Sequence, residues 1–373
     1  MLPYKKKHVK IKNMPTKIAI NGFGRIGRCA FKIAMDKPDL EVAAINDLTN
    51  PRILAHLLKY DTAYGIYFKD IYLEEDGKKV RLENNKGDKD FFKSSAKKTY
   101  LVVEGKKTLV LSQTEPDKLP WKELGVDVVL ECTGRFTEDD TAALHIKAGA
   151  KKVVVSAPTK GGVTETFLLG VNSEKYKGQQ VISNASCTTN NISPVISVMH
   201  SKFKILKSAM TTVHAITAEQ NNVDGPPPKL HPDLRRARAS GFNIVPTTTG
   251  AAKATTKTIP ELEGKFDGTA VRVPVVTGSL SDITMLVSRK TTVEEVNKVL
   301  LDACKESKYN GVLSATYEPI VSSDIIGSPF SAIVDLSLTK VIDGDLVKVL
   351  AWYDNEWGYS NRLVEIAMMV CAR

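Results

Sequence analysis

Three glycines at a fixed spacing, in the segment NGFGRIG of residues 21–27, constrain the fold of this chain more than any other feature. They follow a short apolar run, KIAIN (17–21), and open the segment GRIGRCAFKIAM, whose apolar residues recur at helical spacing. A second apolar run, EVAAIN (41–46), comes next. Strand, helix and strand within ~30 residues predict a βαβ unit, the opening of a doubly wound parallel sheet.

Each glycine of such a motif has its own steric reason. Gly22 allows a tight turn, Gly24 lets the backbone approach a pyrophosphate, and Gly27 lets the helix pack closely on the strand. The start of the helix then offers free N–H groups and a partial positive charge to phosphates. Asp47 ends the second strand, where a carboxylate accepts hydrogen bonds from an adenosine ribose. Because that carboxylate repels a 2′-phosphate, the sequence favours NAD over NADP, although the arginines of the motif leave NADP open.

The rest of the chain predicts two domains of different class. Strand and helix patterns alternate up to KKVVVSAP (151–158), and a charged stretch, 69–107, with 11 Lys/Arg and 8 Asp/Glu, is expected to add surface hairpins. The segment DDTAALHIKAGA (139–150) is expected to be a helix. Past residue 205, long β-branched strands such as TAVRVPVVTGSLSDITMLVSR (269–289) follow without a helix between every pair. We expect an α/β protein with a Rossmann-type doubly wound nucleotide domain and an α+β domain with a mixed or antiparallel sheet.

Cysteine usage favours a reducing compartment. The five cysteines, at 29, 132, 187, 304 and 371, are an odd number without a C-x-x-C pair. That spacing predicts neither a disulfide framework nor a zinc site, so we expect no bound metal.

No apolar run reaches the ~20 residues of a membrane helix, and the N-terminus lacks the apolar core of a secretory signal. We expect a cytoplasmic protein with no membrane partner and a basic arm over residues 1–16.

The formal net charge of +10 raises nucleic acid as a partner. Five of the positive charges are lysines in the first twelve residues, and the remainder suits a pocket for a phosphorylated anion or a solvated surface. We therefore expect that nucleic acid is not the main partner. The alternative to an enzyme is a nucleic-acid-binding protein that keeps this fold.

The Pro-rich basic segment 221–238 is expected to be an ordered functional loop.

Cys187 stands in a setting that does not suit a buried structural thiol. It lies in SNASCTTNN (183–191), among small polar residues, where a predicted helix begins. A thiol there feels the partial positive charge of the helix start, so we expect its pKa to be lowered. A histidine nearby would activate it further, and His214 lies in the strand that follows the helix. The spacing leaves this pairing open, since histidines in strand cores are common. The histidines at 56, 145 and 200 fall in helical patterns and are expected at the surface or in the core.

Taken together, the motifs resemble one family. The segments INGFGRIGR, SNASCTTN, TTVHAIT, TTTGAAKA, RVPV and WYDNEWGYSNR are similar to those of glyceraldehyde-3-phosphate dehydrogenase, the phosphorylating glycolytic enzyme, from about Lys17 to the C-terminus. The resemblance implies NAD as cofactor, glyceraldehyde 3-phosphate and inorganic phosphate as substrates, and a homotetramer. It also implies that the last helix returns to the first domain. The expected domains are therefore 17–186 with 352–373 for NAD binding and 187–351 for catalysis.

The resemblance implies Cys187 as the nucleophile and His214 as its base. The sulfur attacks the aldehyde to give a thiohemiacetal, and His214 takes the hydroxyl proton as hydride leaves for the nicotinamide. Inorganic phosphate then attacks the resulting thioester. The expected activity is NAD-dependent oxidative phosphorylation of D-glyceraldehyde 3-phosphate to 1,3-bisphosphoglycerate. The enzymatic alternative is the related erythrose-4-phosphate dehydrogenase, and phosphate dependence separates the two.

The resemblance also implies two sets of binding residues. The cofactor set is Gly22, Gly24, Arg25, Ile26, Gly27, Asp47, Ser156 and Asn355. The substrate and phosphate set is Ser186, Thr188, Thr217, Arg236, Thr249, Gly250 and Arg272. Within the second set, Thr217 and Arg272 are expected to hold the phosphate of the substrate. The other five are expected around the incoming phosphate, because hydroxyls, N–H groups and guanidinium groups suit its oxygens.

Three positions depart from the family pattern. Thr114 stands where many members carry an arginine near the adenine. Glu219 lies where many relatives have threonine or aspartate, and a glutamate there would repel the substrate phosphate unless Arg272 or a neighbouring lysine neutralises it. Asn191 replaces a second cysteine four residues after the nucleophile, which excludes an intrahelical disulfide. The basic arm and the stretch 69–107 are also longer than usual.

Overall fold

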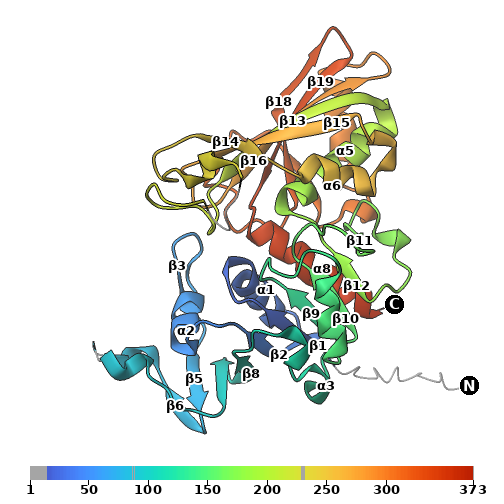
Figure 1. Ribbon diagram of the computed structural model, residues 1–373. Coiled ribbons are helices and arrows are strands. Elements are labelled where there is room, and N and C mark those ends of the chain that lie inside the picture. The colour runs from blue at the N-terminus through green and yellow to red at the C-terminus, as the bar shows by residue number, and fades with distance from the viewer. Residues whose placement is uncertain (1–14, 86, 88, 228–231, 373) are drawn as a thin grey trace, which may run out of the picture.

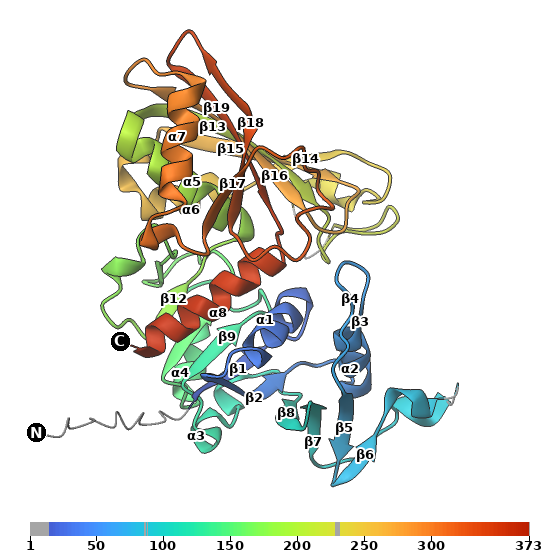
Figure 2. The same cartoon turned by 180° about the vertical axis from the view of Figure 1, so that it is seen from behind.

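The computed structural model describes residues 15–85, 87, 89–227 and 232–372 of the 373-residue chain. Nearly all of the expected basic arm therefore lies outside the described residues. The fold consists of two α/β parts stacked on each other, each built around its own sheet (Figure 1). The helix α8 (Trp357–Ala372) lies at their boundary, beside α1 (Arg25–Met35), in both views of the molecule (Figures 1 and 2). Within the described residues, no helix has the length and apolar character needed to cross a membrane.

The first sheet has ten strands in the order β11-β12-β10-β9-β1-β2-β8-β7-β5-β6. The strands from β11 to β8 pair in parallel, as predicted for a doubly wound sheet, whereas β8, β7, β5 and β6 pair antiparallel. The hairpins of the stretch 69–107 thus continue the main sheet. The strand bounds are β1 (Thr16–Asn21), β2 (Leu40–Asn46), β5 (Ile71–Glu75), β6 (Lys78–Val80), β7 (Thr99–Val103), β8 (Lys106–Leu111), β9 (Val128–Glu131), β10 (Lys152–Val155), β11 (Glu165–Thr166) and β12 (Val181–Ser183).

The helices of this part are α1, α2 (Pro51–Lys59), α3 (Trp121–Leu124) and α4 (Leu144–Lys147), and a small hairpin, β3 (Tyr60–Asp61) with β4 (Gly65–Ile66), follows α2. The helix expected over 139–150 is wrong in length, because a 3-10 turn precedes the single turn of α4. Left-handed backbone at Asp140, with φ of 57°, and at Gly149, with φ of 100°, prevents a longer helix.

The second sheet has seven strands in the order β14-β15-β13-β16-β19-β18-β17. It is mixed, because β13–β15 and β17–β18 are parallel and the other pairs are antiparallel. The single strand expected over 269–289 is two strands, β15 and β16, which are separated at Pro274 and Gly278 and lie on either side of β13. The strand bounds are β13 (Ile205–Ala215), β14 (Val245–Thr248), β15 (Phe266–Val273), β16 (Ser279–Val287), β17 (Leu313–Thr316), β18 (Ala332–Ile342) and β19 (Leu346–Tyr353).

Three helices cover one face of the second sheet (Figure 2). They are α5 (Cys187–Phe203), α6 (Ala251–Thr258) and α7 (Val293–Ala303). Buried residues of α5 such as Ile192, Val195 and Ile196 form a core with the inner faces of β13, β16 and β19. The start of α5 lies only four residues beyond the end of β12, at the carboxyl edge of the parallel sheet. That edge is where doubly wound folds bind their ligands.

Candidate active site

Two adjoining pockets lie along the carboxyl edge of the first sheet. The first is lined by residues that end β1 and β2, including Gly22 and Asp47. The second contains Cys187 and His214. Gly24 and Cys132 line both pockets. The glycine turn and the cysteine therefore face one continuous cleft.

The glycine turn has the steric demands expected from its sequence. Gly22 has a φ of +93°, and a Cβ there would lie 2.7 Å from the backbone nitrogen of Thr133. A Cβ on Gly27 would lie 2.1 Å from the carbonyl oxygen of Gly22, so the helix could not pack as closely on the strand. At Gly24 no atom lies within 4 Å of the position of a Cβ, and the backbone faces open space in both pockets.

Asp47 braces this turn from the end of β2. Its Oδ2 accepts a hydrogen bond of 2.7 Å from the backbone N–H of Phe23, and its Oδ1 accepts one of 2.9 Å from Thr49. The carboxylate lines the first pocket, together with Thr114, which departs from the family pattern.

A strained turn presents Cys187 to the second pocket. Ala185 has a left-handed backbone, with φ of 51°, which few residues other than glycine adopt. Ser186 caps α5, because its Oγ accepts a hydrogen bond of 3.1 Å from the N–H of Thr189. The hydroxyl of Tyr359 in α8 donates a hydrogen bond of 2.9 Å to the carbonyl of Ala185. The turn is thus fixed from both sides, with Cys187 as the first residue of the helix.

The structure brings Cys187 and His214 together, a pairing that the sequence left open. The Sγ lies 3.5 Å from Nε2 of the imidazole. The Nδ1 of His214 lies 2.7 Å from the carbonyl oxygen of Ala215, which can only accept a hydrogen bond. Nη1 of Arg272 also lies 3.1 Å from Nδ1, but it donates to the same carbonyl of Ala215, so the shorter contact with that carbonyl favours the proton on Nδ1 and leaves the lone pair of Nε2 facing the sulfur. The imidazole is set to accept a proton.

The expected lowered pKa of Cys187 is wrong for these surroundings. Burial raises the pKa of the Cys187 thiol, and the nearby Arg272 and the hydrogen bonds of Thr188 only partly oppose this. Burial, with a smaller contribution from Arg272, lowers the pKa of His214 to about 3. Both shifts favour the uncharged forms of the two groups.

Arg272 lies beside this pair, and Glu219 links it to a second arginine, Arg236. Nη1 of Arg272 donates hydrogen bonds of 3.1 Å to the carbonyl of Ala215 and 3.3 Å to the hydroxyl of Thr217. Nη1 of Arg236 donates one of 3.0 Å to Oε1 of Glu219. The same Oε1 lies 3.9 Å from Nη2 of Arg272. Arg236 is the main group that neutralises Glu219, whereas the sequence suggested Arg272 or a lysine.

The remaining predicted anion-binding residues fall into two groups. Ser186 lines the second pocket, and Thr249 and Gly250 stand where α6 begins, with the hydroxyl of Thr249 accepting a hydrogen bond from Ala251. The hydroxyl of Thr188 is buried and makes a hydrogen bond of 2.9 Å with that of Tyr353. The hydroxyl of Thr188 thus already has one partner in the protein and keeps the capacity for a further hydrogen bond.

Asn355 presents one end of its amide to the protein. Its Oδ1 accepts hydrogen bonds from the hydroxyl of Ser279, at 2.9 Å, and from the hydroxyl of Thr277 and the N–H of Gly278, both at 3.2 Å. Asn355 lines the second pocket, with Ser156 and Ile26. The Nδ2 donates to no other residue in the described parts of the chain, so its N–H groups are available to a ligand.

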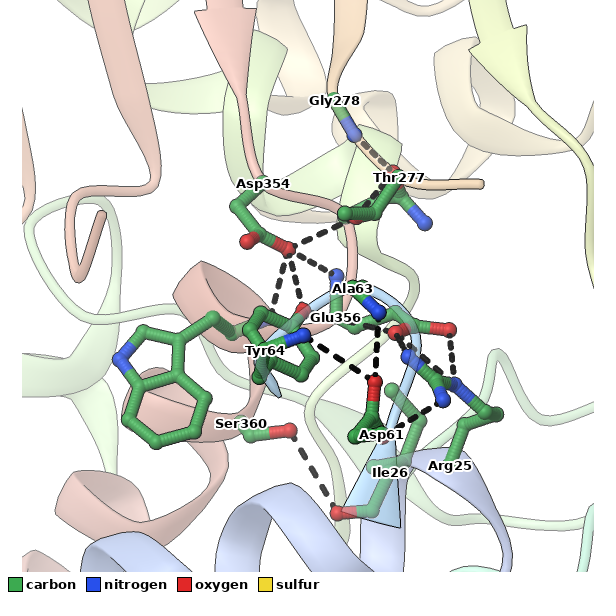
Figure 3. Close-up of polar contacts among 12 residues, drawn as sticks. Arg25, Ile26, Asp61, Ala63, Tyr64, Thr277, Gly278, Asp354, Glu356 and Ser360 are labelled. Carbon is green, nitrogen blue, oxygen red and sulfur yellow. Dashed lines mark hydrogen bonds and ion pairs between the residues drawn. The ribbon is translucent and has the colours of Figure 1, made fainter. Parts of the chain in front are cut away.

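A cluster of charged and polar groups ties Arg25 to the last helix, and the sequence did not reveal it (Figure 3). The guanidinium of Arg25 donates to both carboxylate oxygens of Glu356, with Nε–Oε1 at 2.9 Å, and Nη1 donates to Asp61 at 2.7 Å. The hydroxyl of Tyr64 donates to Asp354 at 2.9 Å. The side chain of Arg25 is therefore occupied, and only its backbone is free for a phosphate. Asp354 and Glu356, the partners of Tyr64 and Arg25, both lie in the segment WYDNEWGYSNR. The motif itself did not indicate which residues they would contact.

A buried polar chain runs beneath the first pocket. The indole N–H of Trp121 donates to Nδ1 of His145 at 2.9 Å, so the imidazole carries its proton on Nε2 and donates it to Glu131 at 2.9 Å. Glu131 also accepts a hydrogen bond of 2.6 Å from the amide of Asn21, which in turn accepts one from Asn46. Glu131 and His145 are fully buried. The chain holds the ends of β1, β2 and β9 together below the pocket. His145 is thus a core residue, one of the two places that its helical pattern allowed.

Among the described residues, no group of histidine, cysteine, aspartate and glutamate side chains could hold a metal ion.

Comparisons with known proteins agree with this geometry. Residues 186–355 match the family model described as the C-terminal domain of glyceraldehyde 3-phosphate dehydrogenase, and residues 16–91 and 82–139 match the NAD binding domain. The glyceraldehyde-3-phosphate dehydrogenase of Geobacillus stearothermophilus is 46% identical over 362 residues, which cover 96% of this chain and 99% of that protein. The enzyme of the same name from Thermotoga maritima is 49% identical over 352 residues, covering 94% and 97%.

These matches, together with the glycine turn and the paired cysteine and histidine, show an NAD-dependent oxidoreductase. The chain belongs to the glyceraldehyde-3-phosphate dehydrogenase family.

Proposed function

We propose that the cleft converts D-glyceraldehyde 3-phosphate, NAD and inorganic phosphate to 1,3-bisphosphoglycerate. The observation that carries the proposal is the 3.5 Å contact of Cys187 Sγ with His214 Nε2. It lies in a pocket that the glycine turn borders, and two further residues of its lining, Thr217 and Glu219, contact Arg272 and Arg236. A cysteine with a base and two anion-binding cations is what oxidation through a thioester to an acyl phosphate requires.

The residues of both pockets suit NAD. We place the adenosine in the first pocket, with Asp47 on its ribose, and the pyrophosphate at the start of α1, over the backbone of Gly24, Arg25 and Ile26. We place the nicotinamide in the second pocket, where Nδ2 of Asn355 would donate to its carboxamide beside Ser156. When bound, NAD supplies the hydride acceptor.

Cys187 and His214 carry the proton and the covalent bond. As Sγ attacks the aldehyde carbon, the thiol proton passes to Nε2 and then to the new oxyanion, which gives a thiohemiacetal. His214 takes the hydroxyl proton back when hydride leaves that carbon, which becomes a thioester. Inorganic phosphate attacks the thioester carbon, and the sulfur departs and recovers a proton.

Two anion subsites follow from the arginines. We assign the phosphate of the substrate to Arg272 and Thr217, whose side chains already contact each other. We assign the incoming phosphate to the five groups around the start of α5 and the start of α6, which are Ser186, Thr188, Arg236, Thr249 and Gly250. Guanidinium groups and helix N-termini both favour phosphate oxygens.

The phosphate dependence of NADH formation tests this proposal. With glyceraldehyde 3-phosphate and NAD, NADH should form in proportion to added inorganic phosphate, and Cys187→Ser should abolish it. NADH formation that does not depend on phosphate would refute the proposal and favour the erythrose-4-phosphate dehydrogenase alternative. Salt-sensitive nucleic-acid binding that persists in Cys187→Ser would support the alternative of a different class.

The proposal includes the organisation that the resemblance implies. We assign NAD binding to residues 17–186 with 352–373 and catalysis to 187–351, in a cytoplasmic homotetramer. The position of α8 supports this division, since it packs beside α1 of the first part although it follows the second sheet in sequence. Light scattering of the purified chain would measure its oligomeric state.

A further inference from the structure

Glu219 occupies the space between the two arginines of the proposed anion subsites. Its Oε1 is 3.0 Å from Nη1 of Arg236 and 3.9 Å from Nη2 of Arg272. The arginine side chains are 15% and 14% exposed, whereas that of Glu219 is 48% exposed. The carboxylate is thus the most exposed of the three charged groups.

The other partners of Arg236 are fixed parts of the sheet. Nε donates to the hydroxyl of Thr247 at 3.0 Å, and Nη2 donates to the carbonyl of Thr248 at 3.3 Å. Both belong to β14. Among the described residues, Glu219 is therefore the one acceptor of Arg236 that does not belong to the sheet. A phosphate that approaches Nη1 would have to replace it. Two anions on one face of a guanidinium repel each other, so they compete for it.

Arg272 is within reach of the same charge. Burial lowers the pKa of Arg272, and Glu219 is the first of the groups that oppose this. Glu219 itself lines the pocket that holds Cys187 and His214. A single carboxylate is therefore shared by the arginine assigned to the substrate phosphate and the arginine assigned to inorganic phosphate.

We propose that Glu219 is an exchangeable internal anion, which takes the place of phosphate between Arg236 and Arg272 until a bound phosphate displaces it. The inference rests on the proposed function, because it assigns phosphate to these arginines. Its consequence is a lowered affinity for phosphate at both subsites. When a phosphate displaces the carboxylate of Glu219 from one arginine, the carboxylate lies nearer the other arginine. Binding of one phosphate therefore affects binding of the other.

Calorimetric titration of the NAD-saturated protein with inorganic phosphate tests this directly. Glu219→Gln keeps the shape and one hydrogen-bond acceptor but removes the charge. We expect its Kd for phosphate to fall roughly 3- to 10-fold, as the loss of one competing ion pair predicts. The KM values for phosphate and for glyceraldehyde 3-phosphate should fall in the same direction. Glu219→Ala should also bind phosphate more tightly than the unaltered chain does.

Asp224→Asn is the matched control. Asp224 lies on the same loop and pairs with Arg238 at 2.9 Å, and it does not line the pocket that holds Cys187. It should leave the Kd unchanged, and an equal gain in this variant would show a general charge effect and overturn the inference. Unchanged or weaker phosphate binding in Glu219→Gln would also overturn it, since Glu219 would then hold Arg236 in place. If the unaltered chain makes NADH without phosphate, the proposed function fails, whereas the titration still decides the role of Glu219.

Discussion

At the scale of single residues, Arg272 connects the nucleophile to the proposed anion sites. It contacts Thr217 on one side, and its Nη1 lies 3.1 Å from Nδ1 of His214 on the other. Its positive charge is the largest influence that favours the thiolate of Cys187 against burial. A cation that binds the substrate phosphate thus also adjusts the reactivity of the sulfur.

Replacement of Arg272 by glutamine should therefore move the alkylation of Cys187 by iodoacetamide to higher pH. The thiolate is the species that reacts, and loss of the cation raises the pKa of the thiol further. His214 stays neutral over this range, because burial is the larger cause of its low pKa. The measurement is the rate of alkylation against pH. Arg236→Gln serves as the control, since Arg236 is not among the groups that shift the pKa of Cys187, and an equal movement there would contradict the explanation.

Glu131 offers a second test at this scale. Glu131→Ala would leave the Nε2 proton of His145 and the amide of Asn21 unpaired in a fully buried place. Removal of one partner from such a network costs about 3 kcal/mol of unfolding free energy or more. Urea titration would measure the loss, and the Kd for NAD should rise with it because the first pocket rests on this network. A neutral effect would show that water replaces the carboxylate.

At the scale of elements, the first turn of α2 anchors the extension of the first sheet. Arg52 donates to both carboxylate oxygens of Glu75 in β5, at 3.0 and 2.6 Å, and its guanidinium lies 4.7 Å from the ring centroid of Phe91. Its Nη1 also donates to the carbonyl of Phe91. The amide of Asn50, which caps α2, donates to the carbonyl of Phe92 at 2.7 Å. The long stretch 69–107 is therefore attached to the helix that follows the adenosine pocket.

Arg52→Ala should detach the segment around Phe91 from α2. The ion pair with Glu75 is nearly buried on both sides, so its loss should cost about 3 kcal/mol of unfolding free energy. Limited trypsin digestion should cleave the stretch 82–98 faster than in the unaltered chain. Lys107→Gln breaks only an exposed pair with Glu74 and should leave the unfolding free energy nearly unchanged, because such pairs are screened by solvent. Equal protease sensitivity in the two variants would refute this anchoring role.

At the scale of the whole molecule, the cluster around Arg25 joins three separate parts of the chain. Arg25 opens α1, Asp61 lies in the β3–β4 hairpin, and Glu356 lies between β19 and α8. Burial raises the pKa of the Asp61 carboxyl, but Arg25 and the backbone N–H groups of Ala63 and Tyr64 together hold it below its ordinary value. The unfolded chain thus binds the proton more readily than the folded one.

The stability contributed by Asp61 should therefore be present above about pH 4 and be lost as the pH falls below it. Asp61→Asn removes this contribution at every pH. The unfolding free energies of the two proteins, measured in urea, should differ most near pH 7 and approach each other in acid. A difference that stays constant from pH 7 to pH 3 would show that the charge of Asp61 is not what stabilises the junction.

Features that depend on local sterics could be predicted from the sequence, and those that depend on distant partners could not. The glycine turn met its expected demands, because the positive φ of Gly22 is a local property and Gly27 meets Gly22 within the same βαβ unit, although the backbone that a Cβ on Gly22 would meet belongs to Cys132 and Thr133. The parallel and mixed sheets followed from strand patterns. The partner of Arg25 could not be predicted, since Glu356 lies 331 residues away. The pKa of Cys187 was predicted in the wrong direction because burial is a property of the whole fold.

The hydrogen bond from Tyr359 to the carbonyl of Ala185 has a consequence for the order in which this protein becomes active. A growing chain that has not yet yielded residues 357–372 lacks this hydroxyl, and it also lacks the helix that packs beside α1. The strained turn before Cys187 then has no support from that side. The nucleophile thus gains its final geometry only after the last helix has left the ribosome.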